Sequence, residues 1–137
     1  MSSDVWSVTS FNALQRDGVA ARRWNLLHPE EKPRLSYVEV CLRDRQGPGV
    51  ASTDYIRTFA EQIRPYVERR YVALGTDGYG RSDFRRKLRE FFEVNRYYVT
   101  IAALNALADD GTIDRKLVGD AIKKYGINPN KPNPVSV

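Results

Sequence analysis

The part of the sequence best suited to bind a ligand is a glycine-rich loop at residues 75–83. It follows an apolar run typical of a strand, and Ser82 or Asp83 can cap a helix behind it. Backbone N–H groups in such a turn can reach an anion, and an arginine adds a fork of donors. The candidate ligand-binding residues are Gly75, Asp77, Gly78, Gly80, Arg81 and Ser82.

A second interpretation of the same loop needs no ligand. Its glycine spacing matches neither the phosphate-binding loop of nucleotide hydrolases nor the dinucleotide-binding fingerprint, and the lysine of the former is missing. Glycines also serve tight turns between a strand and a helix. A structural turn is therefore the favoured interpretation, and binding of an anion or small metabolite is the alternative.

Other chemically useful side chains are few. His28 is the only histidine and stands before Pro29 at a predicted helix end, which favours a structural role. Cys41 is the only cysteine, and its apolar neighbours Val40 and Leu42 favour a buried, unreactive thiol. The paired acids fall at element ends, where they cap helices or face water. We predict no catalytic residue and no metal site, and interpret the chain as a module that helps another protein work.

The chain is basic, with a net charge of +5 over 137 residues. Its basic residues concentrate at 64–89, but acids are interspersed, which is typical of a solvated helix face. No recognised motif supports nucleic-acid binding, so we expect none; contact with an acidic protein partner stays open. No apolar run could span a bilayer, and residues 1–4 do not resemble a secretion signal. We expect a cytoplasmic protein without membrane contact.

Strands and helices are expected to alternate through the first two thirds of the chain. Residues 5–9, 49–52 and 71–74 read as strands, while residues 36–42 fit either a strand or a short helix. Residues 11–27 suggest a helix weakened by Gly18. Thr53 and Asp54 are expected to cap the next helix, which Pro65 should kink or end.

The last third of the sequence is predicted to be helical. One helix lies around residues 98–108, and Asp114 caps another that Gly126 terminates. The pattern predicts an α/β fold, with a small, mostly parallel sheet flanked by helices. One domain is expected at residues 1–127, followed by an extended proline-rich tail at 128–137.

Several blocks of the sequence resemble one known enzyme family. DVWSVTSF at residues 4–11, ASTDY at 51–55 and LGTDGYGRSD at 74–83 are similar to the C-terminal region of bacterial homodimeric pyruvate dehydrogenases, as is the end of the chain around residues 111–134. The resemblance is collinear from residue 4 onward. It implies a transketolase-like C-terminal domain that lacks the strand–helix unit normally opening it, so that a sheet edge is left exposed.

The resemblance also implies a setting for the chain. In the full enzymes, two earlier domains hold thiamine diphosphate and magnesium, decarboxylate pyruvate and acetylate a lipoyl group on the acetyltransferase. The implied partners are those domains, the second subunit of the homodimer and the dihydrolipoyl acetyltransferase complex. No thiamine-contacting motif maps onto this chain. We therefore expect it to bind no cofactor, to be inactive alone, and to serve structure and assembly.

Overall fold

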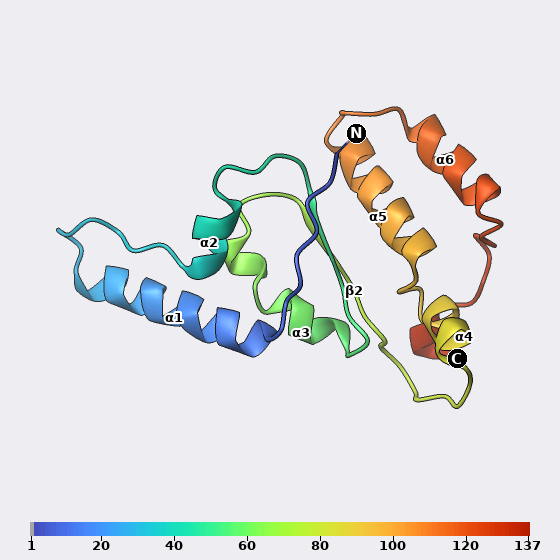
Figure 1. Ribbon diagram of the computed structural model, residues 1–137, viewed down its shortest axis with the longest axis horizontal. Coiled ribbons are helices and arrows are strands. Elements are labelled where there is room, and N and C mark those ends of the chain that lie inside the picture. The colour runs from blue at the N-terminus through green and yellow to red at the C-terminus, as the bar shows by residue number, and fades with distance from the viewer. Residues whose placement is uncertain (1) are drawn as a thin grey trace.

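The computed structural model describes residues 2–137 and contains a sheet of two short parallel strands with helices on both sides. Figure 1 shows α1 (Phe11–Leu27), α2 (Tyr37–Leu42) and α3 (Arg57–Glu61) on one side of the strands. On the other side lie α5 (Arg96–Asp109) and α6 (Arg115–Lys124), with α4 (Arg85–Phe91) near the end of the sheet. The α/β prediction is confirmed.

The sheet consists of β1 (Gly49–Ser52) and β2 (Tyr71–Leu74), paired in parallel from Gly49 opposite Tyr71 to Ser52 opposite Leu74. Parallel strands require a crossover, which α3 and the 3-10 turn η1 (Arg64–Tyr66) supply. The helix α3 ends at Glu61, before the proline, and Pro65 stands in the second position of the separate 3-10 turn η1. Both strands therefore point their carboxyl ends toward the 75–83 loop.

The third predicted strand is wrong. Residues 5–9 are irregular and exposed, and Val5 is 93% exposed. Asp4 forms an ion pair with Arg45 at 3.3 Å, and the Arg45 guanidinium lies 5.8 Å from the Trp6 ring centre. The β-branched residues of this segment favour a strand, but no described backbone pairs with it, and a strand needs a partner.

The core lies between the sheet and the helices α1–α3. Its buried residues are Val38, Ala60, Ile63, Tyr66, Val67, Tyr71 and Ala73. Gly18 is buried in the middle of α1, where an added Cβ would lie 2.3 Å from the Tyr66 ring. The glycine that weakens α1 as a helix is thus needed for α1 to pack against Tyr66.

Most helix starts follow local capping rules. Ser36 and Glu39 form a reciprocal capping box, which settles the ambiguous segment at residues 36–42 as helix. Asp114 caps α6 through the N–H of Lys116, and Gly126 has a φ of +64° just after that helix, as predicted. These caps are encoded within a few residues of the helix that they serve.

Two predicted caps are wrong. The N-cap position of α3 is Ile56 rather than Thr53 or Asp54, and that of α4 is Phe84 rather than Ser82 or Asp83. Neither Ile56 nor Phe84 makes a side-chain capping bond. Thr53 instead accepts from Tyr55 N–H at 3.1 Å and Asp83 from Phe84 N–H at 2.7 Å, while the Asp54 carboxylate binds Arg89 of α4.

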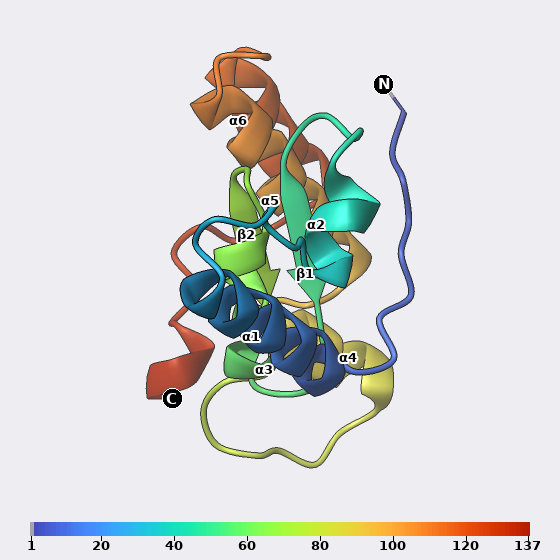
Figure 2. The same ribbon diagram turned by 90° about the vertical axis from the view of Figure 1, so that its left-hand side faces the viewer.

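The end of the chain folds back toward the sheet. Its last turn is the 3-10 helix η2 (Pro134–Ser136), in which Pro134 is buried. Figure 2 shows the C-terminus on the same end of the molecule as α3 and α4. The tail predicted as extended therefore ends in a packed turn.

Candidate functional site

The 75–83 loop starts at the carboxyl end of β2 and runs beside the loop that follows β1. Thr53 N–H donates to Leu74 O at 3.0 Å, and Thr76 N–H donates to Tyr55 O at 2.9 Å. The Thr76 hydroxyl also donates to Asp54 O at 2.8 Å. The two loops thus prolong the pairing of the strands, and this fixes where the candidate residues stand.

Gly75 occupies the closest approach of the two loops. An added Cβ would lie 2.4 Å from Arg57 N and 2.6 Å from Arg57 Cα. Real side chains do not tolerate such contacts with backbone atoms, so only glycine fits here. Gly75 lets two backbones cross, and together with Asp77 and Pro134 it lines a small pocket of about 60 Å³.

Asp77 supplies the cap that α3 lacks in its own sequence. Its Oδ1 accepts from Arg57 N–H at 2.9 Å, and its Oδ2 pairs with Arg57 Nε at 3.0 Å. A carboxylate at the first turn of a helix satisfies a free N–H and complements the helix dipole. The Asp77 carboxylate is therefore engaged in holding the fold.

Gly78 lies against the end of the chain. Its φ is +104°, and an added Cβ would lie 2.7 Å from Pro134 O and 3.1 Å from Val135 Cα. Both the left-handed backbone and the close approach require glycine. Gly78 is thus a contact between the loop and η2.

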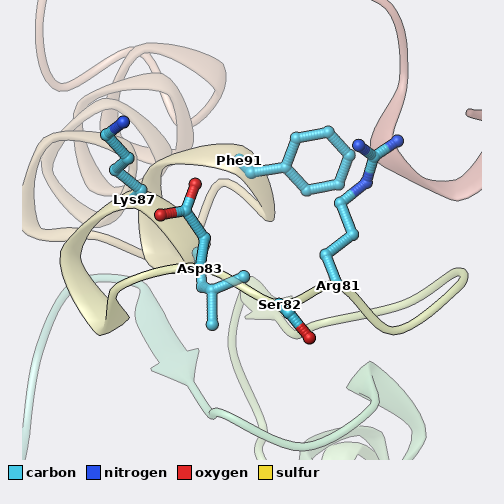
Figure 3. A pocket seen from close by; sticks show the side chains of 6 residues that line it. Arg81, Ser82, Asp83, Lys87 and Phe91 are labelled. Carbon is cyan, nitrogen blue, oxygen red and sulfur yellow. The ribbon is translucent and has the colours of Figure 1, made fainter.

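The remaining three candidates face solvent together. Arg81 and Ser82 border an open depression of about 270 Å³, which is lined by Arg81, Ser82, Asp83, Lys87, Leu88 and Phe91 (Figure 3). The Arg81 guanidinium stacks over the Phe91 ring at 4.1 Å from its centre. At Gly80 an added Cβ would meet nothing within 4 Å. The six predicted residues therefore do not form one site: three build the fold, Arg81 and Ser82 border an open depression, and Gly80 is exposed without lining it.

Helix α4 is tied to the β1 loop by an ion pair. Arg89 donates to both carboxylate oxygens of Asp54, at 3.0 and 2.6 Å, and Arg85 lies 4.0 Å from the same carboxylate. The hydrogen bonds from Arg89 lower the pKa of Asp54 below its usual value. Arg89 thus has a structural role, whereas Arg81, Arg86 and Lys87 on the same part of the chain are exposed and form no ion pair within residues 2–137.

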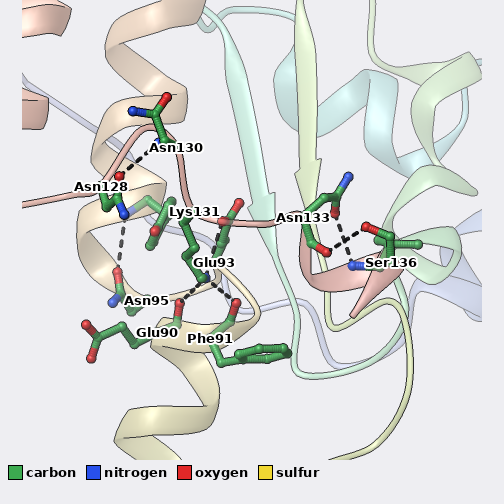
Figure 4. A network of polar contacts seen from close by, with 11 residues as sticks. Glu90, Phe91, Glu93, Asn95, Asn128, Asn130, Lys131, Asn133 and Ser136 are labelled. Atoms are coloured by element: carbon green, nitrogen blue, oxygen red, sulfur yellow. Dashed lines mark hydrogen bonds and ion pairs between the residues drawn. The ribbon is translucent and has the colours of Figure 1, made fainter.

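Sequence reasoning missed the role of Lys131. Figure 4 shows its ammonium group beside the end of α4, where it donates to Phe91 O at 2.6 Å and Glu90 O at 3.2 Å. It also pairs with Glu93 at 3.3 Å, and Glu93 adopts a φ of +62°. A cation at a helix C-terminus satisfies free carbonyls. No local signal could have revealed this contact, because Lys131 lies about 40 residues beyond α4.

The other chemically notable residues have structural surroundings. His28 stacks on Trp24 with ring centres 4.4 Å apart, and its Nδ1 lies 2.8 Å from Trp24 O. Cys41 is partly exposed, which corrects the expectation of a buried thiol. Within residues 2–137 no group of three or more histidines, cysteines or acids could hold a metal ion, and no helix is long and apolar enough to cross a membrane.

Comparison with known proteins gives one consistent result. Residues 1–95 match the transketolase-like TK C-terminal domain family. The whole chain is 62% identical over 137 residues to the pyruvate dehydrogenase E1 component of Cupriavidus necator, of which it covers 15%. It is 60% identical over 136 residues to that of Pseudomonas aeruginosa and 54% identical over 135 residues to that of Escherichia coli K12, again covering 15% of each. The chain, which thus spans about 15% of the length of these relatives, belongs to the transketolase-like C-terminal domain family and corresponds to a segment of bacterial pyruvate dehydrogenase E1 components.

Proposed function

We propose that this chain is the structural and assembly domain of a thiamine-dependent pyruvate dehydrogenase and has no catalytic activity by itself. The complete enzyme would decarboxylate pyruvate and pass the acetyl group to the lipoyl group of an acetyltransferase. Residues 1–127 would form the domain and residues 128–137 its tail. The partners would be the other domains of the enzyme, its second subunit and the acetyltransferase complex, all in the cytoplasm.

The observation that carries this proposal is the continuous similarity to pyruvate dehydrogenase E1 components, which reaches 62% identity over all 137 residues. The local geometry agrees with a structural role. Gly75 lets two loops cross, Asp77 caps α3, and Gly78 packs against the C-terminal turn. A domain whose most distinctive loop holds its own elements together fits a scaffold better than a reaction centre.

Exposed apolar side chains at the end of α1 and along α2 support the assembly role. Leu26 is 79% exposed, Tyr37 63%, Val40 55% and Leu27 54%. Large apolar side chains exposed to water are unfavourable and are typical of surfaces that another protein covers. We infer that these two segments, the end of α1 and α2, pack against other parts of the enzyme.

We expect thiamine diphosphate and magnesium to bind outside this chain. The depression at Arg81 is open to solvent, and within residues 2–137 no three histidines, cysteines or acids cluster as metal ligands. We therefore assign no step of the reaction to these residues. In the proposed enzyme the cofactor and its metal ion belong to domains outside this sequence.

An assay of the chain alone tests the non-catalytic part of the proposal. The purified chain would be incubated with pyruvate, thiamine diphosphate, magnesium and a lipoyl acceptor, and carbon dioxide release would be followed. The expected result is the rate of the blank reaction. Release above the blank that scales with the concentration of the chain would refute this part of the proposal.

A second candidate function is the binding of a small anion at Gly80, Arg81 and Ser82. The observation in its favour is that Arg81, Ser82 and Lys87 border the same open depression. Calorimetric titration with inorganic phosphate, nucleotides and keto acids would test it. Saturable heat that disappears in Arg81→Gln would support the candidate, and flat titrations with all these compounds would remove it.

A further inference from the structure

We infer that the exposed residues Tyr79, Arg81, Phe84, Arg86 and Lys87, in the loop before α4 and on α4, together form a docking site for an acidic segment of a partner protein. We call it the α4 surface. The inference goes beyond the assembly role proposed above, because it names a surface of this chain and the chemistry of its partner. The docking site does not depend on the assembly role and can exist if that role is wrong.

Charge is the first argument. Residues 79–90 contain five arginines or lysines and only two acids, and so carry more than half of the net charge of the chain. Arg89 is bound to Asp54 at 2.6 Å, and Arg85 lies 4.0 Å from the same group. Arg81, Arg86 and Lys87 form no ion pair within residues 2–137. Three cations are therefore available to a negative partner.

Exposed aromatic side chains are the second argument. Tyr79 is 81% exposed and Phe84 is 79% exposed, although both rings carry large apolar areas. Tyrosine, phenylalanine and arginine are the residue types enriched where protein interfaces are most tightly packed. A surface that served only to keep the protein soluble would need charged groups and no exposed aromatic rings.

Rigidity is the third argument. Arg81 is stacked over the ring of Phe91. Phe91 is the last residue of α4, and its carbonyl oxygen accepts a hydrogen bond from Lys131. Gly75, Asp77 and Gly78 fix the start of the loop that carries Tyr79 and Arg81. A preorganised cation loses less freedom on binding, so more of its interaction with a carboxylate appears as affinity.

The interspersed acids decide between partners of different classes. Asp83 lies between Arg81 and Arg86, and Glu90 is at the other end of α4. A continuous phosphate backbone would have to pass these carboxylates, whereas an acidic peptide can place its carboxylates on the cations and apolar side chains on the rings. We therefore infer that the partner is an acidic protein segment and not nucleic acid or a membrane.

Fluorescence anisotropy with the full chain tests this inference. The probe is a fluorescein-labelled peptide rich in glutamate with interspersed leucine and tyrosine, and its control has glutamine at every glutamate. The expected result is saturable binding of the acidic peptide that weakens with added salt, and weak or no binding of the control. Equal binding of the two peptides would overturn the inference.

Charge-reversal variants locate the site. The triple variant Arg81→Glu, Arg86→Glu and Lys87→Glu should lose affinity by roughly tenfold or more, since each exposed pair contributes a few-fold. Its matched control, Arg16→Glu with Arg23→Glu, reverses two exposed charges on α1 and should keep the affinity of the parent. Unchanged affinity in the triple variant, or an equal loss in the control, would overturn the inference.

Two further arms complete the test. Tyr79→Ser with Phe84→Ser should weaken binding without changing the net charge, and unchanged affinity would show that the rings play no part and overturn the proposed surface.

Polyuridylate and phosphatidylserine vesicles serve as competing surfaces, and tighter binding to either than to the peptide would overturn the choice of a protein partner. Circular dichroism confirms that each variant is folded, and the salt dependence of the parent chain provides a readout independent of all variants.

Discussion

Within the 75–83 loop, neighbouring residues have different tasks. Gly75, Asp77 and Gly78 hold together the two strand-end loops, α3 and the C-terminal turn. Gly80, Arg81 and Ser82 stand outside those contacts. A glycine-rich turn after a parallel strand can therefore be mainly architectural, and each of its residues has to be tested separately.

Replacing Asp77 separates its cap from its ion pair. Asp77→Ala should lower the free energy of unfolding by about 1 kcal/mol, because Arg57 N–H loses its acceptor. Asp77→Asn keeps an oxygen for that N–H and loses only the partly exposed pair with Arg57, so it should lose less. Urea unfolding measures both variants. An alanine variant as stable as the parent would contradict the capping role.

Alanine at two glycines of the same loop should have opposite consequences. Gly75→Ala should destabilise the chain by about 1–3 kcal/mol, because its Cβ meets the Arg57 backbone. Gly80→Ala meets open space and has no positive φ to accommodate, so stability should be unchanged or rise by up to about 1 kcal/mol. Thermal unfolding of the pair is the measurement, and equal melting temperatures would contradict the crossing at Gly75.

The buried phenol of Tyr71 predicts a loss of stability in strong alkali. Burial, helped by the Glu61 carboxylate and opposed by Arg64, raises the pKa of Tyr71 from 10.0 to about 12. The unfolded phenol ionises first, so the stabilisation is complete below pH 10 and is lost as the pH rises toward about 12.

Tyr71→Phe is the variant that tests this titration. It removes the hydrogen bond to Ala60 O at 2.8 Å, so it should be less stable than the parent near neutral pH. Its free energy of unfolding should then fall less steeply between pH 10 and 12. Urea unfolding across that range gives both slopes, and parallel slopes would show that Tyr71 is not responsible.

At the level of elements, the end of the chain fastens the glycine-rich loop to α4. Lys131 binds the last carbonyls of α4, while Pro134 and Val135 lie against Gly78. The arrangement explains how a loop with three glycines and a seven-residue helix can keep one position. These tail contacts add to the ion pair of Arg89 with Asp54 and to the bonds of Thr76 and Asp77.

Lys131→Met should loosen this fastening. The variant keeps most of the aliphatic stem but loses the bonds to Glu90 O and Phe91 O, and should cost about 1 kcal/mol of stability. Hydrogen exchange should accelerate at residues 85–94 more than in α1. Lys32→Met, at an exposed loop position, is the matched control and should change neither. Unaltered exchange in α4 would contradict the role of Lys131.

The sequence predicted those elements whose determinants are local. Strands 49–52 and 71–74, the cap at Asp114 and the termination at Gly126 follow from neighbouring residues and were found. The α3 cap is supplied by Asp77 from 20 residues away, and the α4 end is held by Lys131, so neither could be read locally. The strand predicted at residues 5–9 was wrong for the same reason, because strand formation depends on a pairing partner and not on propensity alone.

The candidate site shows the same division. Choosing the 75–83 loop as distinctive required only its composition, and its favoured interpretation as a structural turn agrees with the contacts of Gly75, Asp77 and Gly78. Composition could not indicate that Gly75 would contact Arg57 and that Gly78 would contact Pro134 and Val135. The resulting separation of the six residues depends on tertiary contacts alone.

At the level of the whole molecule, the chain combines a small core with much exposed apolar surface. Two four-residue strands and seven clustered buried residues support a sheet with helices on both sides. Large side chains such as Leu26, Tyr37 and Phe84 remain in water. This balance supports the proposal that the domain packs against other parts of the enzyme.

Reconstitution tests the central claim most directly. A pyruvate dehydrogenase E1 component lacking the segment that this chain matches would be mixed with the chain, and pyruvate-dependent acetyl transfer to a lipoyl acceptor would be followed. The account predicts activity in the mixture and none in either part alone, with Gly75→Ala restoring less than Gly80→Ala. No activity in the mixture, with the chain shown to be folded, would contradict the assembly role and favour the small-anion site at Arg81.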